Sequence, residues 1–159
     1  MINRGLFTIV ILLIVANILQ PVILLNYSNR LEEKYKILEE KELQEDLEYK
    51  QTFFSKSPKE GLKEALYYYS VEHPDIVYKQ AILETGNFKS DLCVNNNNLF
   101  GLYDSKNKKY YSFNHWSESV IAYKKYIQYR YKGNEDYYKF LQRIGYAEDK
   151  QYISKLKSI

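Results

Sequence analysis

The sequence contains few of the residues that cross-link chains or bind metals. Its 159 residues include one cysteine, Cys93, and two histidines, His73 and His115. A single cysteine cannot form an intramolecular disulfide bond, and no cysteine–histidine cluster has the spacing of a zinc site. We therefore expect no metal site, no metal-dependent catalysis and no cofactor, and a domain held together by its apolar core.

Charge is absent from residues 5–25, which are mainly isoleucine, leucine and valine. At a rise of about 1.5 Å per residue, a helix of this length crosses a hydrocarbon core of roughly 30 Å. The run is longer than that of a cleaved signal peptide, and its nearest small-residue cleavage site, around Ala16, lies inside it. We predict an uncleaved signal anchor over residues 1–27, with secretion after cleavage as the alternative. One basic residue precedes the run and two follow closely, a balance that slightly opposes export of the remaining chain.

Charged side chains dominate residues 28–56. Three apolar residues at helical spacing form a seam that soon ends among acidic residues: Leu31, Tyr35 and Leu38. A coiled coil needs about three or four heptads, so we predict a semi-rigid helical stalk, with a dimerisation helix as the alternative. The turn signal around Pro58 ends the stalk and places a compact domain at residues 57–159.

The C-terminal part of the chain is moderately basic. Residues 51–159 contain 17 lysines and arginines against 12 aspartates and glutamates. An excess of this size suits an anionic polymer but is common among proteins. Lysines and tyrosines interleave without a nucleic-acid-binding motif, so we predict no nucleic-acid partner.

One glutamate lies where a helix is expected to end. Residues 76–85 predict an apolar helix, and Gly86 is a residue type that ends helices in a left-handed conformation. Glu84 then lies in the last turn, on the same face as Val77 and Ala81. The helix dipole and partial desolvation both disfavour its ionisation, so we expect a raised pKa, as a general acid requires. The alternative is a partly exposed glutamate at a frayed helix end.

An asparagine-rich loop and a hairpin follow this helix. Residues 95–98 are asparagines, which tolerate left-handed backbone and bond to neighbouring peptide groups. Leu102 and Tyr103 on one side and the largely aromatic residues 110–113 on the other flank a polar, lysine-rich tip, which predicts a β-hairpin. Because the other patterns are helical, we predict a mainly α fold (α+β) with this hairpin as its only sheet.

Four segments in this order resemble the glucosaminidase family of peptidoglycan hydrolases: QAILETGNFKS, NNNLFGLY, FNHWSESVIAYKKYI and GYAEDKQYISKL. The resemblance covers about residues 60–159 and extends to small membrane-anchored members of the family. It implies a lysozyme-like helical domain with a small β-hairpin lobe across a glycan-binding groove. It also implies hydrolysis of the β-1,4 bond after N-acetylglucosamine in peptidoglycan, outside the cytoplasmic membrane.

The resemblance also implies roles for individual residues. Glu84 matches the family's catalytic general acid, and Asn97, Asn98 and Phe100 fall in the loop beside that acid. Tyr146 matches a tyrosine close to the bound sugar. We expect Asn98 to contact substrate, whereas Phe100 is open to a role in the core. Two features depart from the family pattern: the hairpin is shorter, and Asn87 follows Gly86 where the family often has an aromatic residue. Both departures concern the subsites that hold the sugars.

A second carboxylate is needed to meet the positive charge that develops at the anomeric carbon. We propose Glu118, which we expect in the first turn of a helix capped by Ser117 and running to about Tyr131, where the dipole favours the ionised form. An acidic residue there also stabilises a helix without any catalytic role. Asp104 is the reserve, with turn formation as its alternative role. If neither acts, the acetamido group of the substrate assists and Glu84 is the only essential carboxylate.

Two other functions compete with this prediction. One is a muramidase or lytic transglycosylase on the same fold, and the other is a non-catalytic glycan-binding or scaffold module. The predicted partners are peptidoglycan glycan strands, the membrane through the N-terminal helix, and cell-envelope machinery.

Overall fold

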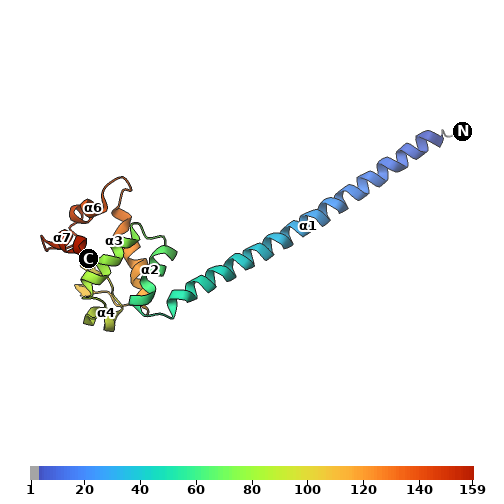
Figure 1. Cartoon of the computed structure of the whole chain (residues 1–159). Helices are drawn as coiled ribbons and strands as arrows, with labels where there is room; N and C mark the ends of the chain where they lie inside the picture. Colours follow the sequence, from blue (N-terminus) through green and yellow to red (C-terminus); the bar gives the residue numbers. More distant parts are fainter. Residues whose placement is uncertain (1–3) are drawn as a thin grey trace. The chain divides into compact units, whose positions relative to one another are not determined.

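The computed structural model describes residues 4–159 of the chain (Figure 1). These residues form two units, one that ends at Leu47 and one that spans Glu48–Ile159, and each is described by itself. Helices make up most of the described residues, whose only sheet is a two-stranded hairpin. The predicted mainly α fold with a small hairpin is confirmed, and its lysozyme-like arrangement stays a prediction.

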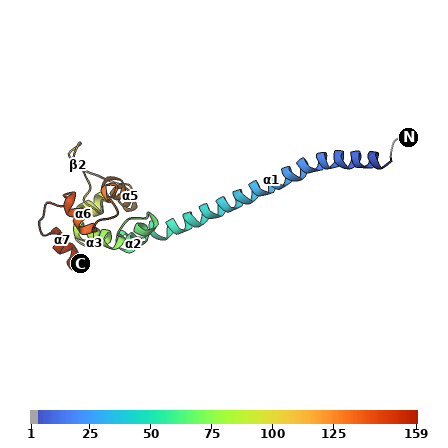
Figure 2. The same ribbon diagram turned by 90° about the horizontal axis from the view of Figure 1, so that it is seen from above.

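The first unit consists of the greater part of helix α1, Arg4–Phe54 (Figure 2). The apolar side chains of its first turns are exposed. Within residues 4–159, α1 is the one helix long and apolar enough to cross a membrane, a property that a signal sequence near the N-terminus shares. The charged segment predicted to be helical continues this helix without a break. Exposed ion pairs one turn apart, such as Lys36 with Glu40, add a few tenths of a kcal/mol each.

The end of α1, from Glu48 to Phe54, belongs to the second unit. Phe53 is fully buried, and its ring lies 5.3 Å from that of Tyr68 and 6.2 Å from that of Trp116. The indole Nε1 of Trp116 also donates to the carbonyl of Lys56 at 2.9 Å. The chain before residue 57 therefore contributes to the core, which the sequence analysis did not predict.

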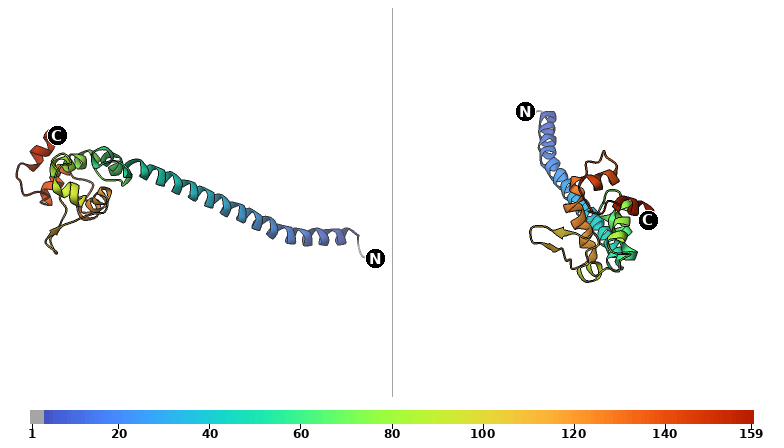
Figure 3. Two further views of the ribbon diagram at one scale, coloured as in Figure 1. Left: turned by 90° about the horizontal axis from the view of Figure 1, so that it is seen from below. Right: turned by 90° about the vertical axis from the view of Figure 1, so that its left-hand side faces the viewer.

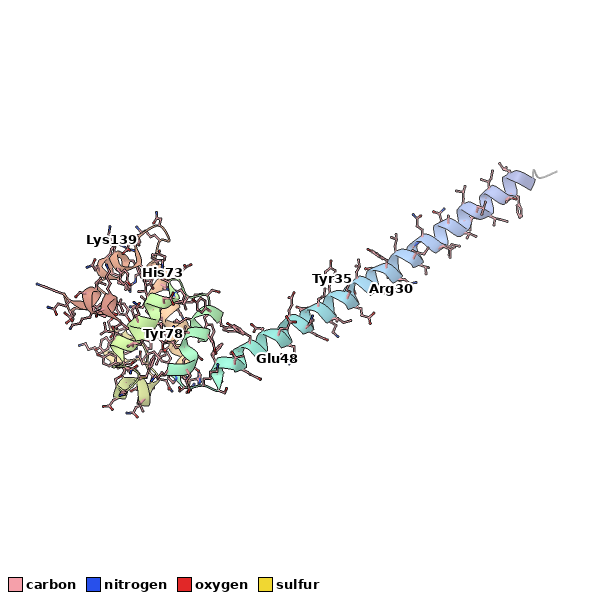
Figure 4. All side chains as sticks on the ribbon, in the orientation of Figure 1. Arg30, Tyr35, Glu48, His73, Tyr78 and Lys139 are labelled. Carbon is pink, nitrogen blue, oxygen red and sulfur yellow. The ribbon has the colours of Figure 1, made fainter. Side chains whose placement is uncertain are left out.

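The second unit is a cluster of short helices whose side chains fill the space between them (Figure 4). Its elements are α2 (Pro58–Tyr68), α3 (Pro74–Glu84), α4 (Asp91–Asn96), β1 (Tyr103–Asp104), β2 (Lys109–Tyr110), α5 (Trp116–Tyr126), the 3-10 helix η1 (Gln128–Arg130), α6 (Tyr137–Arg143) and α7 (Tyr152–Ser158). Helix α2 packs against α3 and α5, and α3 packs against α7. The core between them is formed mainly by leucines, valines and aromatic residues, among them Leu62, Leu66, Val77, Val120, Tyr123, Phe140 and Leu156.

The hairpin extends away from these helices (Figure 3). Its strands are antiparallel and pair Tyr103 with Tyr110 and Asp104 with Lys109. The carboxylate of Asp104 accepts hydrogen bonds at the tip from the backbone of Lys106 and from both nitrogens of Asn107. The predicted hairpin is therefore present, with a second strand shorter than the largely aromatic residues 110–113 suggested.

Helix α5 begins and ends differently from the prediction. Its N-cap is His115, whose Nδ1 accepts the backbone N–H of Ser117 at 3.2 Å, so the prediction of Ser117 as the cap is wrong. The other ring nitrogen lies 3.0 Å from the carbonyl of Phe54 and must donate to it, which leaves Nδ1 unprotonated and able to accept. The helix stops at Tyr126, short of the predicted end, because the chain then tightens into η1.

Candidate functional site

Glu84 is the last residue of α3. Val77, Gln80 and Ala81 are the buried residues of this helix, and Glu84 follows one turn later on the same face. Its side chain is therefore half-buried although it lies at a helix end. Thr85 follows as the fully buried C-cap, and its hydroxyl donates to the carbonyl of Ala81 at 2.6 Å.

The backbone after Glu84 turns in the left-handed direction for three consecutive residues. Gly86, Asn87 and Phe88 have φ values of 54°, 61° and 63°. This conformation costs a residue with a side chain roughly 1–2 kcal/mol. The Thr85 hydroxyl holds the turn by accepting the backbone N–H of Phe88 at 2.7 Å. The turn ends α3 abruptly and leaves Glu84 at its tip.

The surroundings of the Glu84 carboxylate favour its protonated form. Burial raises its pKa above the usual range, and the hydroxyl of Tyr152 opposes this by hydrogen bonding to the carboxylate. The hydroxyl of Tyr146 lies close enough for the charge of Glu84 to raise its pKa further, beyond the larger effect of burial. A Cβ at position 101 would lie 3.4 Å from Oε2 of Glu84, so the backbone of Gly101 passes directly beside the carboxylate.

A buried network of polar side chains connects Tyr152 to the rest of the core. Gln80 donates to the Tyr152 hydroxyl at 3.3 Å and accepts from the Tyr123 hydroxyl at 2.7 Å. The Tyr123 hydroxyl lies 2.9 Å from that of Tyr137, which also accepts from Gln128 at 2.9 Å. Because each of these side chains is hydrogen-bonded to another, the network holds the Tyr152 hydroxyl in position beside Glu84.

The two asparagines predicted to bind substrate bond to the protein backbone in this structure. Asn98 is buried, and its amide group donates to the carbonyls of Leu102 and Tyr111 and accepts the N–H of Leu102. Asn97, in left-handed conformation at the end of α4, donates to the carbonyl of Phe113 at 3.0 Å. Both side chains join the loop to the hairpin.

An open groove of about 430 Å³ lies between the hairpin and the segments that follow α5 and α6. It is lined by Phe100, Gly101, Leu102, Tyr103, Asp104, Ser105, Tyr111, Tyr126, Ile127, Arg130, Ile144, Gly145 and Tyr146. The Tyr146 hydroxyl donates to the carbonyl of Phe100 at 2.9 Å, which ties the two sides together. Phe100 is buried, with its ring centroid 4.6 Å from that of Tyr123, so most of it belongs to the core. Glu84 is not itself among the lining residues, but two of them, Gly101 and Tyr146, are neighbours of its carboxylate.

The two candidates for a second carboxylate occupy different places. Asp104 lines the groove, and the hydrogen bonds from Asn107 and Lys106 lower its pKa, so that it is ionised near neutral pH. Glu118 lies in the first turn of α5, where Oε2 accepts the backbone N–H of Asn114 at 3.2 Å. Glu118 is not among the residues that line the groove.

Within residues 4–159, no group of three or more His, Cys, Asp or Glu side chains is arranged to hold a metal ion.

Sequence reasoning missed Tyr152 and Gln80 as neighbours of the candidate acid. Tyr152 gives no local signal, because it belongs to α7 and reaches Glu84 only through the packing of α3 against α7. A signal for Gln80 did exist, because it is a polar residue one turn before Glu84 on an otherwise apolar face. Such a residue is buried only when it has partners.

Comparison with known proteins gives one match. The sequence model of the family described as glucosaminidase, mannosyl-glycoprotein endo-beta-N-acetylglucosaminidase, matches residues 59–159. No curated protein and no solved structure matches the chain.

Proposed function

Because the chain belongs to the glucosaminidase family, we propose that it is a peptidoglycan hydrolase that cleaves the β-1,4 bond after N-acetylglucosamine. Family membership supports a glycan substrate and glycoside hydrolysis. The bond that is cleaved and the residues that cleave it are our proposal.

The observation that carries the proposal is the position of Glu84 beside the groove. Burial raises its pKa, so the carboxyl group keeps its proton at a higher pH than an exposed glutamate does. Gly101 lies beside Oε2 and also lines the groove, which brings the carboxylate next to the space where a glycan would bind. Glu84 would give its proton to the glycosidic oxygen while the bond to the anomeric carbon breaks.

The partner of Glu84 must stabilise positive charge at the anomeric carbon. We place Asp104 ahead of Glu118 because it lines the groove and is ionised. Its oxygens are engaged by the hairpin tip, so it acts in this proposal as a fixed negative charge rather than a mobile nucleophile. Glu118 and the acetamido group of the substrate remain the alternatives. We keep Asn97, Asn98, Phe100 and Tyr146 as residues that shape the sugar site.

The apolar part of α1 supports a location at the membrane. We propose that residues 1–27 anchor the chain in the cytoplasmic membrane, that residues 28–56 form a stalk, and that residues 57–159 act on the cell wall outside. Secretion after signal cleavage is the alternative.

The test is digestion of purified peptidoglycan by the full-length protein in detergent, followed by mass analysis of the new reducing ends. We expect N-acetylglucosamine ends from the wild type and a rate about 10²–10⁴-fold lower for Glu84→Gln, because general acid catalysis contributes about that much. Glu148→Gln, which removes an exposed carboxylate, is the matched control and should leave the rate unchanged.

Asp104→Asn and Glu118→Gln in the same assay identify the second carboxylate. A loss comparable to that of Glu84→Gln assigns the role, and normal rates for both assign it to the acetamido group. N-acetylmuramic or anhydro ends would show a muramidase or lytic transglycosylase instead. Binding without cleavage by the wild type would identify a glycan-binding module.

A further inference from the structure

Arg130 is the only cation among the residues that line the groove. It ends η1, and its backbone N–H donates to the carbonyl of Ile127 at 3.2 Å. Gln128, two residues earlier, is buried and bonds to both the N–H and the carbonyl of Glu72. The segment that carries Arg130 is therefore held firmly in place.

The guanidinium group of Arg130 makes no ion pair within the described residues. Its Nε is buried and has no hydrogen-bond partner there. Its aromatic neighbour is Tyr129, whose ring centroid lies 5.7 Å from the central carbon of the guanidinium group. Because Nε is closed to solvent, a ligand in the groove would meet this half-buried side chain through the outer nitrogens of its guanidinium group.

The carboxylates near Arg130 are engaged by other groups. Glu135 forms its ion pair with Arg143, which also donates to the backbone carbonyl of Arg130 at 3.1 Å. Asp104, the other charged residue of the groove, accepts its hydrogen bonds from the hairpin tip. The charge of Arg130 is thus left available to something that enters the groove.

We propose that Arg130 binds a carboxylate that the glycan strand carries on its N-acetylmuramic acid residues. This inference rests on the proposed function and specifies which substituent the groove recognises. The carboxylate belongs either to the stem peptide or, where the peptide has been removed, to the bare lactyl group. Guanidinium and carboxylate pair through strong, charge-assisted hydrogen bonds, and arginine stays protonated at any physiological pH. Chitin has no such carboxylate, so the affinity of the protein for chitin should not depend on Arg130.

The test measures binding of full-length protein in detergent to three glycans fixed to a solid support: peptidoglycan with its stem peptides, glycan strands stripped of their peptides by an amidase, and chitin. All proteins carry Glu84→Gln so that the glycans stay intact. Arg130→Gln removes the charge and Arg130→Lys keeps it. Lys139→Gln is the control, because Lys139 is an exposed lysine of α6 outside the groove lining (Figure 4). Fluorescence of the chain's single tryptophan shows whether each variant is folded.

We expect Arg130→Gln to weaken binding to carboxylate-bearing glycan by about tenfold or more while binding to chitin is unchanged. Arg130→Lys should keep part of the preference, and Lys139→Gln all of it. A loss on intact peptidoglycan alone identifies the stem peptide, and a loss on stripped glycan alone identifies the lactyl group. Equal weakening on all three glycans, or on none, overturns the proposal. Failure of the proposed function is separate, since it appears as absence of cleavage by the wild type.

Discussion

At the scale of single residues, the Tyr152 hydroxyl is the group that opposes the effect of burial on Glu84. Burial raises the pKa of Glu84, and hydrogen bonding from Tyr152 lowers it. Removing the hydroxyl in Tyr152→Phe leaves burial unopposed, so the pKa of Glu84 should rise further. In the proposed reaction Glu84 acts only while protonated, so activity should fall as the pH rises through this pKa.

The alkaline limb of the pH–rate profile of Tyr152→Phe should therefore move to higher pH. The measurement is the rate of peptidoglycan digestion across pH, with Tyr67→Phe, which changes an exposed tyrosine, as the control. The shift distinguishes action on the acid from a general loss of stability, which would lower the rate at every pH alike. An unmoved limb, or one moved to lower pH, would show that Tyr152 does not act on the acid.

The position of Glu84 could be predicted from sequence because it depends on local chemistry. Gly86 ends the helix, and spacing alone places Glu84 on the buried face. The hydrogen-bond partner of Glu84 could not be predicted, because Tyr152 belongs to α7 and reaches the carboxylate only when α3 packs against α7. Arg130 was missed for the same reason, since the groove that it lines is assembled from three separate segments.

At the scale of elements, the hairpin depends on Asn98. Two strands of two residues each are marginal alone, and Asn98 joins the strand ends through three hydrogen bonds. Asn98→Ala leaves the buried N–H of Leu102 and the carbonyl of Tyr111 without this partner. We expect the free energy of unfolding to fall by about 2–4 kcal/mol, since each unpaired buried group costs about 1–3 kcal/mol.

Urea unfolding followed through the fluorescence of Trp116, the only tryptophan of the chain, measures this loss. Asn95→Ala, at an exposed position of the same run, should change the stability little. If Asn98→Ala kept full stability but lost glycan binding, the side chain would serve the substrate, as the sequence analysis expected. Element boundaries were harder to predict than this hairpin, because the cap of α5 depends on the contact of His115 with Phe54, far away in sequence.

At the scale of the whole molecule, the chain combines a helix with an uncharged first segment and a compact unit that has a groove of its own. Composition predicted the long helix, because an uncharged run and a charged segment need no tertiary contact to be recognised. Composition alone does not separate an anchor from a cleaved signal sequence. The two differ in whether the apolar segment remains in the mature protein.

The membrane anchor predicts that the full-length protein stays in the membrane pellet after alkaline extraction and keeps the mass of the complete chain. Replacing Ile11 and Ile14 with arginine places two charges in the apolar run, each costing about 2.5–3.5 kcal/mol at the centre of a spanning helix. This double variant should leave the membrane fraction. Replacing Tyr35 and Leu38 with arginine adds the same charge to the segment that is already charged, so that protein should stay in the pellet. A wild-type protein that is released by alkali and lacks the mass of its first residues would instead be a secreted enzyme, and the apolar helix would be its signal sequence.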